Sequence, residues 1–114
     1  MGTFVISKKE NGLFKFEFNS RKGKTILTSQ SYKTKEECMK DINHLKDKIE
    51  SLSFLRFKSP SGKFFFKMIY SGHIYGISRK FTTELLLAKG LDEMQKNFYN
   101  SEILDFSQEH IFDL

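Results

Sequence analysis

Apolar and charged side chains alternate along LFKFEF, residues 13–18, so that three phenylalanines fall on every second position. A period of two is typical of an antiparallel strand that buries one face and leaves the other in water. The run TFVISK comes before this segment and KTILTS comes after it, with turns that contain Gly12 and Gly23 between them. The first part of the chain therefore predicts three antiparallel strands with a layer of phenylalanines on one face.

A helix is predicted directly after the third of these strands. Thr34 is followed three residues later by Glu37, which matches a capping box, in which each side chain satisfies a backbone N–H group of the first turn. Apolar residues then recur at helical spacing along one face, at Cys38, Ile42, Leu45 and Ile49. We expect this stripe to cover the phenylalanine face of the sheet.

Residues 53–98 repeat the pattern of residues 3–49. The shift is 50 residues before one gap in a turn and 49 residues after it, so that Phe16 falls on Phe66. The stripe of the first helix falls on Leu87, Leu91, Met94 and Phe98. The match indicates that one unit was duplicated, with strands in FLRFK, KFFFKMIY and HIYGIS and a helix from about residue 83 to residue 98.

The second predicted helix is more apolar than the first, because it carries Leu85 and Leu86 beside the aligned stripe. Either this helix is flanked on both sides within the monomer, or part of it meets another chain. The monomer explanation is preferred, since surplus apolar residues usually belong to a core. The following segment EILDF alternates again and predicts a final strand, whereas the remaining SQEHIFDL is short enough to fray.

The glycines, aromatic residues and helix start of the first unit resemble the YegP-like family of small bacterial and archaeal proteins. The matching residues are Gly12, Phe14, Phe16, Gly23, Ile26, Leu27, Thr28, Ser29, Tyr32, Lys33 and Thr34. The second unit departs further, and keeps Gly62, Phe64, Phe66, Gly72, Ser78 and Gly90, with Phe81 in place of the tyrosine and Leu85 to Leu87 in place of small or polar residues. The resemblance extends over about residues 3 to 106.

The resemblance implies an α+β fold of two tandem β-β-β-α-β repeats, and it implies no activity or catalytic residues. The repeats would form one continuous antiparallel sheet, with two helices packed on one face and the C-terminal strands exchanged between repeats. Residues 1–106 would then be a single domain, with repeat one at about residues 1–52, repeat two at about residues 53–106, and an acidic C-terminal tail at residues 107–114. A unit of about 50 residues is too small to bury much surface alone, which agrees with shared strands.

Composition and charge narrow the class of protein. The 114 residues fit one domain, 39% hydrophobic residues argue against disorder, and a single cysteine forbids an internal disulfide. The sequence has neither a signal-peptide pattern nor an apolar run long enough to span a bilayer, so we expect a cytoplasmic protein that does not enter membranes. The net charge is +5, yet after Lys96 the only charged side chains are acidic, at Glu102, Asp105, Glu109 and Asp113.

No constellation of catalytic or metal-binding residues is evident in the sequence. His44, His73 and His110 lie too far apart for a compact metal motif. Cys38 belongs to the apolar stripe and is expected to be a small buried side chain instead of a nucleophile. The glycines lie in separate turns and form no phosphate-binding loop. We therefore predict no catalytic residue, no cofactor and no metal; an enzyme would need a pocket in which His44 or His73 meets a carboxylate.

Binding is the favoured kind of activity. Alternation along KFFFKMIY places an aromatic ring between two lysines on the outer side of the strand, and a turn concentrates three more cations. The candidate binding surface consists of Lys63, Phe65, Lys67, Ile69, Arg21, Lys22 and Lys24. The sequence predicts a non-enzymatic protein-interaction or assembly module, whose partner is an unknown protein or a second copy of the chain. The alternative is single-stranded nucleic-acid binding, since a base can stack on an aromatic ring beside cations; the modest charge and the absence of a recognised RNA-binding motif place it second.

Overall fold

The computed structural model describes residues 2–107, in seven strands, two α-helices and one short 3-10 helix. The first half of the chain runs β1 (Thr3–Lys8), β2 (Phe14–Asn19), β3 (Thr25–Ser29), α1 (Lys35–Asp47) and the 3-10 helix η1 (Ile49–Ser51). The second half runs β4 (Ser53–Lys58), β5 (Phe64–Tyr70), β6 (His73–Ser78), α2 (Glu84–Asn97) and β7 (Glu102–Asp105). The predicted strands and helices are therefore all present, including the final strand in EILDF.

All seven strands belong to one sheet, in the order β4-β5-β6-β3-β2-β1-β7. The two halves join through β3 and β6, which pair antiparallel. The expectation of a purely antiparallel sheet is wrong, because β7 pairs with β1 in the parallel direction and the sheet is mixed. The physical reason is that β7 reaches the far edge of the sheet by a helical crossover, whereas antiparallel neighbours can be joined by short turns.

The exchange of C-terminal strands goes in one direction only. The strand β7 follows α2 of the second half and pairs with β1 of the first half, as the exchange requires. The chain leaves α1 through η1 directly into β4, and β4 pairs with β5 of its own half. Within residues 2–107 no strand lies between α1 and β4, so the reciprocal half of the expected exchange is not formed.

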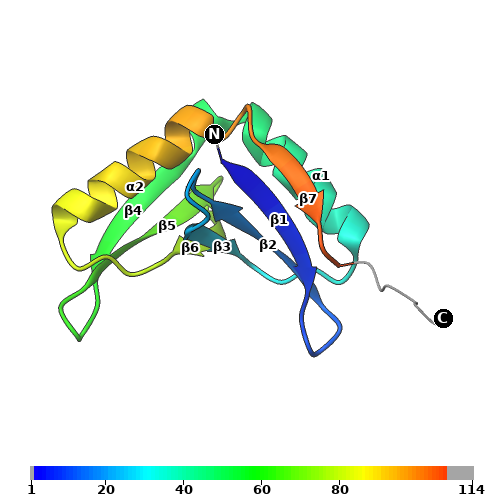
Figure 1. Cartoon of the computed structure of the whole chain (residues 1–114), viewed down its shortest axis with the longest axis horizontal. Helices are drawn as coiled ribbons and strands as arrows, with labels where there is room; N and C mark the ends of the chain where they lie inside the picture. Colours follow the sequence, from blue (N-terminus) through cyan, green and yellow to red (C-terminus); the bar gives the residue numbers. More distant parts are fainter. Residues whose placement is uncertain (1, 108–114) are drawn as a thin grey trace.

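Both helices lie on the same face of the sheet, and the hairpins β1–β2 and β4–β5 project away from them at the two ends of the molecule (Figure 1). The core lies between these two layers. Alternate residues of the strands point into it and are fully buried, such as Phe4, Phe16, Phe18 and Phe66. The predicted stripe of α1 is buried at Cys38, Ile42 and Leu45, and that of α2 is buried at Leu87, Leu91, Met94 and Phe98.

The helix starts follow the predicted chemistry. The Thr34 hydroxyl accepts from the Glu37 N–H at 3.1 Å, and the Glu37 carboxylate accepts from the Thr34 N–H, which completes the capping box.

The preferred explanation for the surplus leucines of α2, that they are covered within the monomer, is wrong. Leu85 and Leu86 lie in the first turn of the helix and are 64% and 46% exposed, so neither is enclosed within the monomer.

The two halves contain the same unusual hydrogen bonds at matching positions. The hydroxyl of Ser29 accepts from the Phe16 N–H at 2.8 Å, and the hydroxyl of Ser78 accepts from the Phe66 N–H at 2.9 Å. Each hydroxyl donates in turn to the carbonyl of the next residue. Single bridges outside the strands also match, between Phe14 and Tyr32 and between Phe64 and Phe81.

The pairing of β3 with β6 places matching residues opposite each other. Thr28 lies opposite Ile77, and these two positions are also equivalent in the alignment of the halves, as a two-fold arrangement about this point requires. Gly76 occupies the position equivalent to Leu27. A Cβ atom on Gly76 would lie 3.0 Å from Leu27 Cδ2 and 3.0 Å from the Thr28 carbonyl oxygen. One large side chain therefore fills the space at this junction, and its counterpart is a glycine.

The second helix packs on strands of the first half. The ring of Phe98, directly after α2, lies edge-on to Phe4 with 4.8 Å between centroids and lies 5.4 Å from the ring of Phe18. The Lys46 ammonium of α1 donates to the Ser101 carbonyl at 2.8 Å, at the start of β7. Contacts of this kind tie each half to elements of the other.

Replacing Phe98 with alanine tests this packing. We expect the free energy of unfolding to fall by about 3–5 kcal/mol, because the substitution opens a cavity between α2 and two strands of the other half. Chemical denaturation followed by circular dichroism measures the change. Tyr99→Ala is the control, since Tyr99 is 60% exposed and should cost little; equal losses for the two variants would contradict the packing described.

Candidate binding face

The helix-free face is defined as the side of the sheet away from α1 and α2. Its residues alternate with the buried ones, and cross-strand partners share a face. In the first half it carries mainly polar side chains, since Val5 lies opposite Glu17, Ser7 opposite Lys15, and Thr28 opposite Glu17 on the other side. A polar, open sheet face is the ordinary arrangement in a protein whose helices cover only one side.

In the second half the same face is apolar. Leu55, Phe57, Phe65 and Ile77 occupy the positions that Val5, Ser7, Lys15 and Thr28 hold in the first half. Leu55 and Ile77 are 50% and 45% exposed. Ile69 and Ile74 lie opposite each other on β5 and β6 and extend the same surface. The apolar patch consists of Leu55, Phe57, Phe65, Ile69, Ile74 and Ile77.

An aromatic pair lies at one end of the apolar patch. Phe57 of β4 and Phe65 of β5 are cross-strand partners, and their rings stack with 5.4 Å between centroids and 20° between planes. The ammonium of Lys67 lies 4.8 Å from the centroid of the Phe57 ring, as in a cation–π contact. Faces of both rings are therefore already in contact with protein groups.

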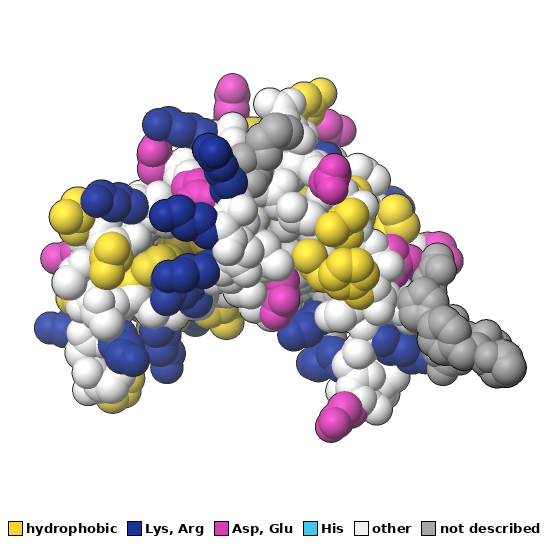
Figure 2. All heavy atoms as spheres, viewed as in Figure 1, with side chains coloured by type: hydrophobic (Ala, Val, Ile, Leu, Met, Phe, Trp, Pro, Cys, Tyr) yellow, Lys and Arg dark blue, Asp and Glu magenta, His cyan; other side chains and the backbone are white. Residues whose placement is uncertain are grey.

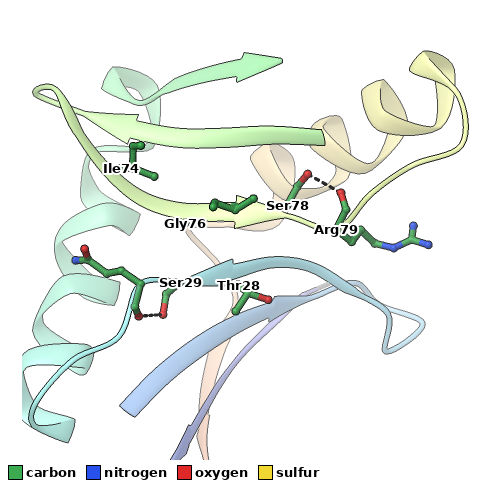
Figure 3. Close-up of a pocket in the computed structure, with 8 residues that line it drawn as sticks. Thr28, Ser29, Ile74, Gly76, Ser78 and Arg79 are labelled. Carbon is green, nitrogen blue, oxygen red and sulfur yellow. Dashed lines mark hydrogen bonds between the residues drawn. The ribbon is translucent and has the colours of Figure 1, made fainter. Parts of the chain in front are cut away.

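A hollow lies at the other side of the apolar patch, where β3 meets β6. It has a volume of about 390 Å³, and Ile74, Ile77 and Thr28 are among its lining residues. Figure 3 shows the two strands on either side of it, with the bonds from Ser29 and Ser78 to their neighbouring carbonyls holding the backbone at its rim. Because Ile74 and Ile77 also belong to the apolar patch, the hollow and the patch form one continuous surface.

The charge on this part of the sheet has a single sign. Between Glu50 and Glu84 the sequence has no aspartate or glutamate. The cations in the same stretch are Arg56, Lys58, Lys63, Lys67, Arg79 and Lys80. On the helix-free face itself, Lys63 and Lys67 lie on the same side of β5 as Phe65, and Arg79 lines the hollow, which favours an anionic partner.

The structure separates the predicted binding residues into two groups. Lys63, Phe65, Lys67 and Ile69 lie together on or beside β5, facing the helix-free side. The cations of the β2–β3 turn, residues 20–24, lie instead against α2, where the Arg21 N–H donates to the Glu93 carboxylate at 3.1 Å. Arg21, Lys22 and Lys24 line a hollow of about 810 Å³ beside this helix. In Figure 2 basic side chains gather at this place. Glu93 supplies a negative charge within it, so it is not a simple anion site.

Sequence reasoning missed the contributions of β4 and β6 to the face, namely Leu55, Phe57, Ile74 and Ile77. The signal was present in the alternation of FLRFK, whose outward residues are Leu55 and Phe57. A comparison of outward positions between the two halves would have found it, because Ser7, Lys15 and Thr28 of the first half have apolar counterparts in the second half.

Titratable side chains outside the helix-free face are buried or have neighbouring side chains as partners. Burial raises the pKa of the Cys38 thiol to about 12, which makes the thiolate scarce and agrees with the predicted buried side chain. Burial also raises the pKa of Tyr32, whose hydroxyl lies 2.8 Å from an Asp41 carboxylate oxygen. His73 Nε2 lies 2.7 Å from Gln30 Oε1, and the ring of His44 lies edge-on to Tyr70.

Two further findings concern ions and membranes. Within residues 2–107 no group of three or more histidine, cysteine or acidic side chains lies close enough together to hold a metal ion. None of the helices in this part of the chain has the length and apolar character needed to cross a bilayer. The predicted histidine His110 and the acidic residues Glu109 and Asp113 lie outside the described residues.

Comparisons with known proteins place the chain in a family. No family model matches it. It is 28% identical to the UPF0339 protein YegP of Escherichia coli over 106 residues, which are 91% of this chain and 96% of the relative. It is 36% identical over 47 residues to a UPF0339 protein of Methanosarcina acetivorans, and these residues are 41% of this chain but 81% of that shorter relative. The chain belongs to the UPF0339 family.

The fold agrees with this assignment. The solution NMR structure of a UPF0339 protein from Shewanella oneidensis matches 99% of this chain and 98% of its own with a TM-score of 0.86, at 24% identity. The YegP-like resemblance predicted from the sequence is therefore confirmed. The solved structure of E. coli YegP is that of a protein of unknown function, so the activity of this UPF0339 protein has to be argued from its own surface.

The carboxylate of Asp105 fixes the end of β7. It accepts from Ser107 N–H at 2.8 Å and lies 2.9 Å from the Lys35 ammonium of α1. The hydrogen bond from the Ser107 hydroxyl, followed by the contact with Lys35, lowers the pKa of Asp105 from 3.8 to about 2. Because the folded-state pKa is depressed, this group stabilises the fold above about pH 4, and its contribution is lost as the pH falls through about 2.

Replacing Ser107 with alanine tests the origin of this stabilisation. We expect the pKa of Asp105 to rise from about 2 toward 3.8, because the carboxylate loses the donor that lowers its pKa most. Carboxyl carbon NMR shifts followed between pH 5 and pH 1.5 measure it. Ser31→Ala, on an exposed segment elsewhere, should leave the pKa of Asp105 unchanged; the same result for Ser107→Ala would contradict the assignment.

Proposed function

We propose that this UPF0339 protein is a non-enzymatic binding module, which uses the helix-free face of β4, β5 and β6 to hold an acidic, partly apolar segment of another protein. The observation that carries the proposal is the difference between the two halves on this one face. Lys15 and Thr28 of the first half correspond to Phe65 and Ile77 of the second half. The buried positions between them keep their apolar character in both halves, so the difference does not serve the core.

The chemistry of the face supports a protein partner that carries carboxylates. Exposed apolar patches with a polar rim are typical of interaction sites, and removing such side chains from water favours association. The rim here has Lys63, Lys67 and Arg79, and the segment between Glu50 and Glu84 has no carboxylate of its own. A second copy of the same face is a poor partner, because Lys63 and Lys67 would then meet like charges.

Single-stranded nucleic acid is the alternative, and the same cations favour it. A sequence-independent platform needs ring faces on which bases can stack. Phe57 and Phe65 stack on each other, and Lys67 lies over Phe57, so the rings offer edges more than open faces. This geometry suits a protein surface better than a row of bases.

We also infer that the chain is a duplicated unit, with residues 1–106 forming one domain, repeats at about residues 1–52 and 53–106, and an acidic segment at 107–114. Support comes from the matching Ser29 and Ser78 hydrogen bonds and from the pairing of Thr28 with its equivalent, Ile77. Further support comes from the short Methanosarcina acetivorans relative, most of which matches only 41% of this chain.

The test of the proposed function uses a synthetic peptide in which aspartate alternates with leucine and phenylalanine. We expect it to shift the NMR signals of β4, β5 and β6 and to bind less tightly as the salt concentration rises. Phe65→Lys and Ile77→Thr, which install the residues of the first half, should each weaken binding by about tenfold, since central apolar contacts dominate such interfaces. Absence of peptide binding at low salt would contradict the proposal.

Controls separate the alternatives. Leu86 of α2 is 46% exposed and Ile77 is 45% exposed, so Leu86→Thr is a matched control for Ile77→Thr and should leave peptide affinity unchanged. An oligothymidylate is titrated in parallel. One set of results would replace the proposed function with the nucleic-acid function. In that case the oligonucleotide binds, the peptide does not bind, and Phe65→Lys weakens binding of the oligonucleotide.

A further inference from the structure

One edge of the sheet has a strand position that the described chain leaves open. The strand β1 is paired on one side by β2 and on the other by β7. The strand β4 holds the equivalent place in the second half, where β5 pairs with it as β2 pairs with β1. It is the last strand in the sheet order, so its outer edge has no partner strand within residues 2–107 (Figure 1).

The connectivity explains why this position is open. The strand that covers β1 is the one that follows α2, namely β7. The strand that follows α1 is β4 itself, so the first half has no strand left to cover the edge of the second half. An exposed edge strand presents a row of free backbone N–H and C=O groups that can pair with another chain.

The sequence contains a second segment with the pattern of β7. Residues 102–106 read EILDF, and residues 110–114 read HIFDL, so both have isoleucine, a large apolar residue, aspartate and a large apolar residue in succession. In β7 this pattern serves as an edge strand. Ile103 lies opposite Phe4, Leu104 lies opposite Val5, and the Phe106 N–H donates to the Ile6 carbonyl at 2.8 Å.

We propose that residues 110–114 of a second copy add as a parallel strand to the outer edge of β4. In the register that β7 adopts on β1, Ile111 would lie beside Phe54 and Phe112 beside Leu55. Asp113 would then lie beside Arg56. Arg56 is exposed, and the sequence has no acidic residue between Glu50 and Glu84, the stretch that contains β4, β5 and β6. Segment 108–114 carries acidic side chains and no lysine or arginine, which complements the basic β4 edge.

The added strand comes from a second copy, because residues 110–114 of the same chain cannot reach the outer edge of β4. Six strand spacings separate β7 from β4, or about 29 Å at about 4.8 Å each. Residues 107–110, which would have to bridge this distance, span at most about 11 Å when fully extended. Reciprocal exchange of two segments between two chains closes a dimer, since each chain offers one segment and one edge.

Sedimentation velocity of the complete chain over a range of concentrations tests this proposal. We expect the complete chain to associate with rising concentration, and a chain that stops after residue 107 to remain monomeric with an unchanged NMR spectrum in β1 to β6. Phe112→Asp should also abolish association. A complete chain that stays monomeric throughout, or a shortened chain that associates equally well, would overturn the proposal.

A charge exchange tests the register. Arg56→Glu and Asp113→Arg should each weaken association by about tenfold, because each sets like charges beside one another, and the two substitutions together should restore it. Lys22→Glu makes the same change in net charge as Arg56→Glu on a distant turn and should have little effect. Failure of the double variant to recover would overturn the pairing of Asp113 with Arg56. The proposed dimer interface uses the edge of β4, whereas the proposed peptide site uses the helix-free face. Phe65→Lys should therefore weaken peptide binding without changing association, so the two proposals can fail independently.

Discussion

The packing of Phe98 against Phe4 and Phe18 is the contact on which the rest of the structure depends. It places the end of α2 over strands of the first half, next to the point where Lys46 of α1 holds the backbone at Ser101. The cores of the two halves are then joined, because α2 contacts β3, Phe98 packs on Phe4 and Phe18, and β7 pairs with β1. A small unit gains buried surface in this way that it could not gain alone.

This shared core determines where the two halves are free to differ. Residues that point toward the helices fill matching places in both halves, as Phe16 and Phe66 do, and both are fully buried. Residues that point the other way are not enclosed between the sheet and the helices. Lys15 and Phe65 hold equivalent positions on that side and have opposite character. The face that the helices leave uncovered is therefore the one on which a binding function can be built.

Much of the fold could be predicted from the sequence, because alternation and helical spacing report which side chains are buried. The capping box at Thr34 and Glu37 located one helix start directly. The parallel direction of β7 could not be predicted from alternation, which fixes faces and not directions. The exposure of Leu85 was predicted wrongly, since an apolar side chain does not reveal whether a neighbour covers it. The β5 part of the binding face followed from alternation, but joining it to Phe57 and Ile77 required the cross-strand register.

Native-state hydrogen exchange tests the central claim, that the two halves fold as one unit around a shared core, most directly. The amides of Phe16 in β2 and Phe66 in β5 are measured in rising denaturant. The shared core predicts that both exchange through the same global opening, with one free energy and one dependence on denaturant. Exchange of Phe66 through an opening of clearly lower free energy, while Phe16 stays protected, would contradict it.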